Sequence, residues 1–179
     1  MTARQRRVAV TGVGLVTPVG CDVASTWDAL LAGRSGVAPI SLFDASGFTV
    51  RIAAEVKGFR DADASDDRKL LKFTNRSHRF ALAAAEQAFR DAGIRPTPDA
   101  ATRWGCAVGA GMMGVDFADL DDVHRRCATE GELDTGLLAE AQGSAADPLA
   151  FARSICNAGL SVLIRRFGIQ GYATAVHTA

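Results

Sequence analysis

The sequence has 179 residues, of which 48% are hydrophobic and 22% are charged, a balance typical of globular domains and unlike that of disordered or collagen-like chains. Twenty basic residues balance twenty acidic ones, so a basic nucleic-acid-binding surface is not indicated. No apolar run approaches the ~18 residues of a membrane span, and a chain of this length is expected to bury one sizeable core.

The first part of the chain predicts short elements separated by turns. β-Branched residues that lead into a Gly-rich turn are typical of a strand, and apolar residues on one face that stop at a glycine are typical of a helix. The predicted elements are a strand at 7–10, a helix over 22–32, a strand at 50–56 and a solvated acidic loop over 61–67.

The strongest helix signal lies over residues 74–92, where alanines and phenylalanines recur at helical spacing and Gly93 follows as a C-terminal cap. Its alanine faces are narrow, so neighbouring elements can approach closely. Further predicted elements are a buried strand at 104–108, a helix over 115–127, one helix from Pro148 to Phe167 that ends at Gly168, and a strand at 172–176. Strands that alternate with long helices indicate a layered α/β fold whose sheet is covered on both faces.

The cysteines show neither a CxxC pair nor zinc-finger spacing, so no metal site is predicted. Four cysteines in a chain of this size also do not indicate a disulfide framework. Cys21, Cys106, Cys127 and Cys156 are therefore interpreted as reduced thiols, most of them packed in the core. Cys156 is expected in the middle of a helix, where a nucleophilic role is not favoured.

The N-terminus has the outline of a lipoprotein signal peptide, because arginines at 4, 6 and 7 precede an apolar stretch that ends at Cys21. Glycines, threonines and Pro18 interrupt that stretch. We therefore interpret the segment as a first strand and expect a cytoplasmic protein.

Residues 109–114 form a literal GxGxxG after a predicted strand and before a predicted helix, which is the outline of a dinucleotide site. No second strand with an acidic residue follows at the required distance. The turn at 10–14 is similar to that of nucleotide-binding reductases, but Val16 and Pro18 stand where those enzymes need glycine. Tight-turn glycines are the favoured interpretation of both segments.

Single side chains give weaker signals. We expect His78 and His124 to lie at the surface or behind a site, and His177, in an apolar strand, to be a buried structural histidine. The paired carboxylates at 66–67 and 121–122 are interpreted as solvated faces or helix starts. Because residues 173–179 are small and apolar and no polar tail follows, we expect the chain to be the first part of a longer protein.

Several segments together resemble β-ketoacyl-acyl-carrier-protein synthases, in the same order over essentially the whole chain. The opening RRVAVTGVGLVTPVG of residues 6–20 resembles their first strand and loop. The segments that continue the resemblance are 27–36, 43–44, 51–56, the Gly-rich turn at 109–114, Asn157 and GIQG at 168–171.

The resemblance implies a thiolase-like fold built from two similar halves, with residues 1–179 as the N-terminal one. It implies decarboxylative Claisen condensation of an acyl thioester with malonyl-acyl-carrier protein, in fatty-acid or polyketide elongation. In such enzymes a cysteine takes the acyl group and two histidines assist decarboxylation, without cofactor or metal. The implied partners are an acyl carrier protein with phosphopantetheine-linked chains and a second subunit, in a homodimer or a heterodimer paired through the terminal strand.

No catalytic residue falls within this chain, because the resemblance places the cysteine directly after Ala179 and the two histidines further on. It does imply pocket positions. These are Met112 as the acyl gate, Leu149 and Ala150 along the acyl tunnel, and Ser154 and Ile155 facing across the dimer.

Two other functions stay open. Chain-length factors share the fold without the nucleophile and act as non-catalytic partners of a ketosynthase; cysteine after Ala179 would indicate the enzyme, and glutamine or another inert residue the partner. A thiolase-like enzyme that uses coenzyme A thioesters is the third. The acyl chain length and the choice between fatty-acid and polyketide pathways are not determined by these residues.

Overall fold

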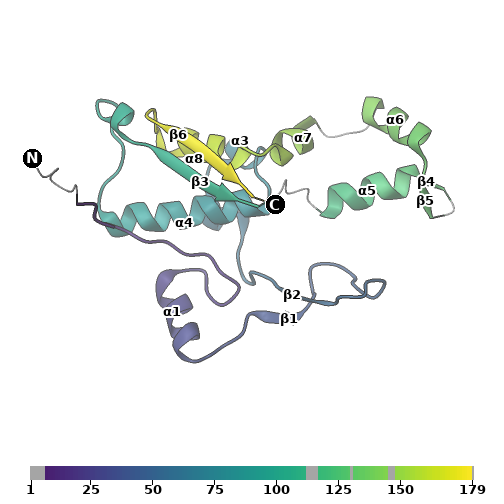
Figure 1. Cartoon of the computed structure of the whole chain (residues 1–179), viewed down its shortest axis with the longest axis horizontal. Coiled ribbons are helices and arrows are strands. Elements are labelled where there is room, and N and C mark those ends of the chain that lie inside the picture. The colour runs from purple at the N-terminus through teal and green to yellow at the C-terminus, as the bar shows by residue number, and fades with distance from the viewer. Residues whose placement is uncertain (1–6, 112–116, 130, 145–147, 179) are drawn as a thin grey trace, which may run out of the picture. The chain divides into compact units, whose positions relative to one another are not determined.

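The computed structural model describes residues 7–111, 117–129, 131–144 and 148–178 (Figure 1). The chain separates into two compact units, one made of Met1–Asp63 with Ala83–Arg95 and the other of Ala64–Leu82 with Pro96–Ala179. Among the helices within these ranges, none is both long and apolar enough to cross a bilayer.

The first unit contains a capped helix and a small hairpin. Helix α1 (Val23–Leu31) begins after Asp22, whose carboxylate accepts a hydrogen bond from the Ser25 N–H at 2.7 Å, as an N-cap residue does. Strands β1 (Val37–Pro39) and β2 (Ile52–Ala54) pair antiparallel. The predicted helix over 22–32 and the strand within 50–56 are confirmed.

The predicted strand at 7–10 is wrong. These residues form no strand, and the side chains of Val8 and Val10 are 94% and 84% exposed. A strand exists only where a neighbour completes its backbone hydrogen bonds, and no strand in the described part of the chain pairs with this segment.

The Gly-rich turn at residues 10–14 packs against the second half of helix α4 (Arg76–Ala92). A β-carbon on Gly12 or Gly14 would lie under 3.0 Å from the helix backbone at Ala88 or Ala84. Two helix side chains bind the turn, since the Leu15 N–H donates to Gln87 at 3.1 Å and the Val13 N–H to Asp91 at 2.9 Å. These glycines serve close packing, as the narrow alanine faces predict.

The second unit is built around a parallel strand pair, β3 (Cys106–Ala110) and β6 (Ala173–His177), with helix α8 (Ala158–Phe167) packed on it (Figure 1). In strand β3 only Cys106 and Val108 are half-buried and the other three residues are exposed, so the strand is confirmed but its predicted burial is not. The remaining elements are α2 (Asp61–Ala64), α3 (Arg68–Leu71), a 3-10 turn at Ala101–Arg103, α5 (Phe117–Cys127), β4 (Ala128–Thr129), β5 (Glu132–Leu133), α6 (Thr135–Ser144) and α7 (Pro148–Ser154).

The acidic segment 61–67 is not a simple solvated loop. It forms the short helix α2, and Ala64 and Ser65 are buried. Asp67 caps α3 by accepting from the N–H groups of Lys69 and Leu70 at 2.9 and 3.0 Å. The carboxylate at this position is therefore a helix start, one of the two interpretations that the pattern allowed.

The single helix predicted from Pro148 to Phe167 is broken in two. Pro148 is the first residue of α7 as expected, but the helix ends at Ser154 and α8 begins at Ala158. The Ala158 N–H donates to the Ile155 carbonyl at 3.0 Å, so a turn joins the two helices. The caps at the other helix ends are confirmed, since Gly93 and Gly168 have φ of +67° and +66°, which glycine adopts without steric cost.

Candidate functional site

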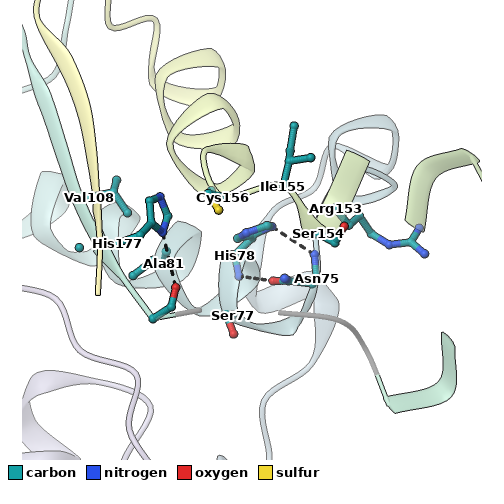
Figure 2. Close-up of a pocket in the computed structure, with 14 residues that line it drawn as sticks. Asn75, Ser77, His78, Ala81, Val108, Arg153, Ser154, Ile155, Cys156 and His177 are labelled. Atoms are coloured by element: carbon teal, nitrogen blue, oxygen red, sulfur yellow. Dashed lines mark hydrogen bonds between the residues drawn. The ribbon is translucent and has the colours of Figure 1, made fainter. Parts of the chain in front are cut away.

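A cavity of about 220 Å³ lies in the second unit (Figure 2). Three regions far apart in the sequence surround it: the start of α4, the carboxyl ends of β3 and β6, and the connection between α7 and α8. The lining residues are Asn75, Ser77, His78 and Ala81; Val108, Gly109, Ala110 and Gly111; Arg153, Ser154, Ile155, Cys156 and Gly159; and His177.

The parallel register brings the two strand ends together. Ala110 of β3 is paired with His177 of β6, and the Thr178 N–H donates to the Ala110 carbonyl at 3.4 Å. The end of β3, with Gly111 directly after it, and the end of β6 therefore meet at one edge of the sheet. The carboxyl ends of parallel strands are where α/β folds bind ligands.

Helix α4 begins at the cavity with a reciprocal cap. The His78 N–H donates to Asn75 Oδ1 at 3.0 Å, and the Asn75 N–H donates to His78 Nδ1 at 3.3 Å, which is a capping box with histidine in the place of glutamate. Since Nδ1 accepts, the proton of the neutral ring lies on Nε2.

The ring of His78 also lies against the start of α8, where a β-carbon on Gly159 would come within 2.9 Å of it. His78 therefore forms part of the cavity wall and is half-buried. The sequence pattern predicted His78 at the surface or behind a site and did not predict a position in the cavity wall. The spacing of Asn75 and His78, three residues apart before an apolar helix, is the signal that could have predicted this orientation.

His177 is half-buried at the end of β6. Its Nδ1 lies 3.5 Å from the carbonyl oxygen of Gly111 (Figure 2). Its Nε2 is buried and has no hydrogen-bond partner among the described residues. Within the described residues, the predicted structural histidine is therefore hydrogen-bonded on one side of the ring.

The cysteines differ from the expectation of core thiols. All four are free, and Cys127 alone is buried. Cys156 is exposed in the turn between α7 and α8 and contributes to the cavity wall, because the helix that was expected to bury it is interrupted there. Burial raises the pKa of the Cys106 thiol, which disfavours the reactive thiolate.

The predicted pocket positions divide into three groups. Ser154 and Ile155 line the cavity, and the Ser154 hydroxyl donates to the Phe151 carbonyl at 2.9 Å. Leu149 and Ala150 are half-buried on α7 and are not among the described residues that line it. Met112 and Ala179 lie outside the described residues.

Exposed basic side chains gather on α3 and α8 near the same unit's surface. This basic cluster consists of Arg68, Lys69, Lys72, Arg165 and Arg166. The pKa of the Asp67 carboxyl is lowered first by its hydrogen bond from the Leu70 N–H and further by the charges of Arg165 and Arg166. The two helices therefore present their positive charges close together. Within the cluster, Arg166 pairs with Asp66 at 3.4 Å.

The carboxylates at 121–122 lie on a solvated face of α5, where they pair with Arg125 and Arg126 at 2.8 and 2.9 Å. His124 on the same helix is exposed, as predicted.

Comparison with known proteins places these features in context. The sequence model of the family described as "Beta-ketoacyl synthase, N-terminal domain" matches residues 5–179. The chain is 44% identical over 115 residues to a 3-oxoacyl-[acyl-carrier-protein] synthase 2 of Coxiella burnetii, a match that covers 64% of this chain and 28% of that protein. It is 42% identical over 110 residues to the tetracenomycin polyketide synthase ketoacyl synthase beta subunit of Streptomyces glaucescens, with 62% and 27% covered.

Among solved structures, the ishigamide ketosynthase/chain length factor is similar, with a TM-score of 0.72 and 28% identity over 94% of this chain and 39% of that one. The similarity confirms the predicted α/β, thiolase-like fold. The chain spans less than two fifths of the length of each of these relatives.

Proposed function

This chain belongs to the β-ketoacyl synthase family, and we propose that the protein carrying it condenses an acyl thioester with malonyl-acyl-carrier protein, with loss of carbon dioxide, in fatty-acid or polyketide elongation. The observation that carries the proposal is the family match over residues 5–179. Residues 1–179 are, in this proposal, the N-terminal part of the synthase.

The geometry of the β3–β6 edge supports the proposal. A cysteine directly after Ala179 would leave the sheet near the carboxyl end of β3, since the Thr178 N–H is bonded to Ala110. A strand end that passes into a helix offers N–H groups and a positive helix end, which favour a thiolate and a developing oxyanion. The cysteine would take the acyl chain from its carrier, and the carbanion left by malonyl decarboxylation would then attack the new thioester.

The acyl chain would enter the second unit. Ser154 and Ile155 line the cavity and support this assignment. Met112 as the gate and Leu149 and Ala150 along the tunnel remain proposals that rest on the family resemblance. The same proposal includes pairing of the terminal strand with a second subunit. It also includes a cytoplasmic location, with which the four free thiols agree.

A second candidate is a non-catalytic chain-length factor. It is favoured by the 28% identity to the solved ishigamide ketosynthase/chain length factor. Both candidates share every feature described above, and the residue that follows Ala179 separates them.

The decisive experiment uses the full-length protein that carries this chain. Sequencing past Ala179 should find cysteine, and the purified protein should convert an acyl-carrier and malonyl-carrier pair into a 3-ketoacyl product. Replacement of that cysteine by alanine should abolish condensation. Glutamine at this position, with activity only in the presence of a ketosynthase partner, would replace the proposal by the chain-length factor.

A further inference from the structure

The cap at the start of helix α4 depends on the charge of one histidine. The Asn75 N–H donates to Nδ1 of His78 at 3.3 Å, and the His78 N–H donates to Asn75 Oδ1 at 3.0 Å (Figure 2). The first of these bonds needs a lone pair on Nδ1, which only the neutral imidazole has. Protonation places a hydrogen on Nδ1 as well, so that two donors face each other. The reciprocal cap therefore exists only while His78 is neutral.

A positive charge is also unfavourable at this end of the helix. The N-terminus of an α-helix carries a partial positive charge, so a cation in its first turn is disfavoured. His78 is the third residue of α4, where a capping box usually has glutamate or glutamine, neither of which becomes a cation. Imidazole takes up its proton between about pH 5 and 8. Histidine at this position therefore makes the helix start sensitive to pH in that range.

The ring of His78 joins the helix start to the cavity wall. A β-carbon on Gly159 would lie 2.9 Å from its Cδ2 atom, so the ring packs directly on the first turn of α8. Asn75 and His78 both line the cavity. A ring that can no longer accept from the Asn75 N–H has to turn or leave this position. Loss of the cap therefore changes the wall of the cavity as well as the end of the helix.

Other ionisable groups lie near His78. In the first turn of its own helix and in the cavity wall, the described ones are Arg76, Arg79, Arg153, Cys156 and His177. Arginine keeps its charge throughout this pH range, and a thiol ionises mainly above it. His177 is the other described group of the wall that can take up a proton in the same range, so the experiment has to separate the two imidazoles.

We propose that His78 couples proton uptake to the shape of the cavity. The neutral ring completes the cap and holds the wall, whereas the protonated ring releases the first turn of α4. Because the folded helix start binds the neutral form, its contribution to stability is present above the pH at which the ring ionises and is lost as the pH falls through that value. This inference goes beyond the proposed function, since it requires no reaction.

Hydrogen–deuterium exchange of the full-length protein measures the effect without a ligand. Protection factors, corrected for the pH dependence of intrinsic exchange, are compared at pH 7.5 and 5.5. Peptides that cover the first two turns of α4 should lose protection about 3- to 10-fold at the lower pH, the equivalent of one net hydrogen bond. Peptides from α1 (Val23–Leu31), which contains no histidine, serve as the internal reference and should not change.

Three variants make the result specific. His78→Gln supplies an amide oxygen that completes the capping box and does not titrate, so protection should be equal at the two pH values. His177→Gln removes the other imidazole of the wall and should leave the pH effect unchanged. His124→Gln, at an exposed position on α5, is the matched control and should also leave it unchanged.

Binding of a ligand gives a second readout, which rests on the proposed function. The pantetheine amide of a saturated ten-carbon acid cannot transfer its acyl group, and its affinity, measured by calorimetry, should fall over the same pH range in the wild-type protein but not in His78→Gln. Absence of binding at either pH contradicts the proposed function alone, because the exchange experiment uses no ligand.

Equal protection of the wild-type helix start at pH 7.5 and 5.5 would overturn the inference. A pH effect that persists in His78→Gln, or that disappears in His177→Gln, would overturn it too, since another group would then be the one that takes up the proton. If His78→Gln fails to fold, the wild-type protein and His177→Gln still decide.

Discussion

Glu55 illustrates how single residues organise the first unit. Its side chain is only 9% exposed and accepts hydrogen bonds from the Ser41 hydroxyl at 2.6 Å, the Ser41 N–H at 3.0 Å and the Leu42 N–H at 3.1 Å. These bonds hold the segment after β1 to the residue after β2. The Ser41 hydroxyl, followed by the backbone N–H groups and the charge of Lys57, lowers the pKa of Glu55.

The lowered pKa predicts a pH dependence of stability. Because the pKa is lower in the folded protein than the ordinary 4.5, the carboxylate stabilises the fold fully above about pH 4.5, and this contribution is lost as the pH falls through the folded value. Glu55→Gln should lower the melting temperature of the full-length protein at pH 7 and flatten its decline below pH 4.5. Glu132→Gln, on exposed β5, is the control, and an equal effect of both changes would contradict the assignment.

At the scale of elements, the close contact between the Gly-rich turn at residues 10–14 and helix α4 depends on glycine having no side chain. A β-carbon on Gly14 would meet the backbone at Ala84, which has no room to give way. The alanines at 84, 88 and 92 have small side chains, so that face of the helix also allows a close approach. The turn therefore lies directly on the helix and is bound there by Gln87 and Asp91.

Gly14→Ala should accordingly destabilise the protein by about 1–3 kcal/mol, the usual cost of overpacking. Gly47→Ala is the matched control, because a β-carbon at Gly47 meets nothing within 4 Å, and such surface changes usually stay within about 0.5 kcal/mol. Urea denaturation followed by circular dichroism measures both. A Gly14→Ala protein as stable as the Gly47→Ala protein would show that the turn does not pack on the helix as described.

At the scale of the whole molecule, charge is balanced overall but not locally. The basic cluster on α3 and α8 is exposed, and Arg166 within it pairs with Asp66 at 3.4 Å. The arginines of α5 are paired with aspartates of the same helix. Under the proposed function, the substrate arrives on a carrier protein through a phosphopantetheine arm whose phosphate is negative. A local positive surface accelerates and strengthens such an encounter, and the effect weakens with salt.

Reversal of charge at Lys69 or Arg165 to glutamate should therefore weaken binding of the carrier-linked substrate roughly fivefold, the equivalent of about 1 kcal/mol. Binding of a pantetheine thioester without the carrier protein's surface should change much less. Arg125→Glu on α5 is the control. Surface plasmon resonance at two salt concentrations measures the effect, and equal losses for all three variants would argue against a docking surface on α3 and α8.

Much of the local structure could be predicted because its causes are local. The capping residue Asp22, the helical repeat before Gly93 and the positive-φ glycines act within a few positions of the element that they define. The family resemblance rests on such segments too, and so it predicted the fold class before any contact was known.

The predictions of secondary structure failed where the structure depends on more than the neighbouring residues in the sequence. Residues 7–10 have the composition of a strand but no strand beside them within the described residues. The apolar repeat from Pro148 to Phe167 continues across Cys156, yet a turn at Ile155–Asn157 divides it and exposes the thiol. No periodicity distinguishes a continuous helix from two helices that keep the same apolar face.

The amino-acid order alone determined the start of α1, the glycines that follow α4 and α8, and the family to which the chain belongs, because these depend on neighbours within one or two turns. Tertiary structure alone decided that Ala110 and His177, 67 residues apart, share a strand register, and that His78 and Cys156 face one cavity. Among the described residues, it also left one nitrogen of His177 buried without a partner. Such relations arise only when the chain folds back on itself, since burial and pairing belong to the surroundings of a residue and not to the residue.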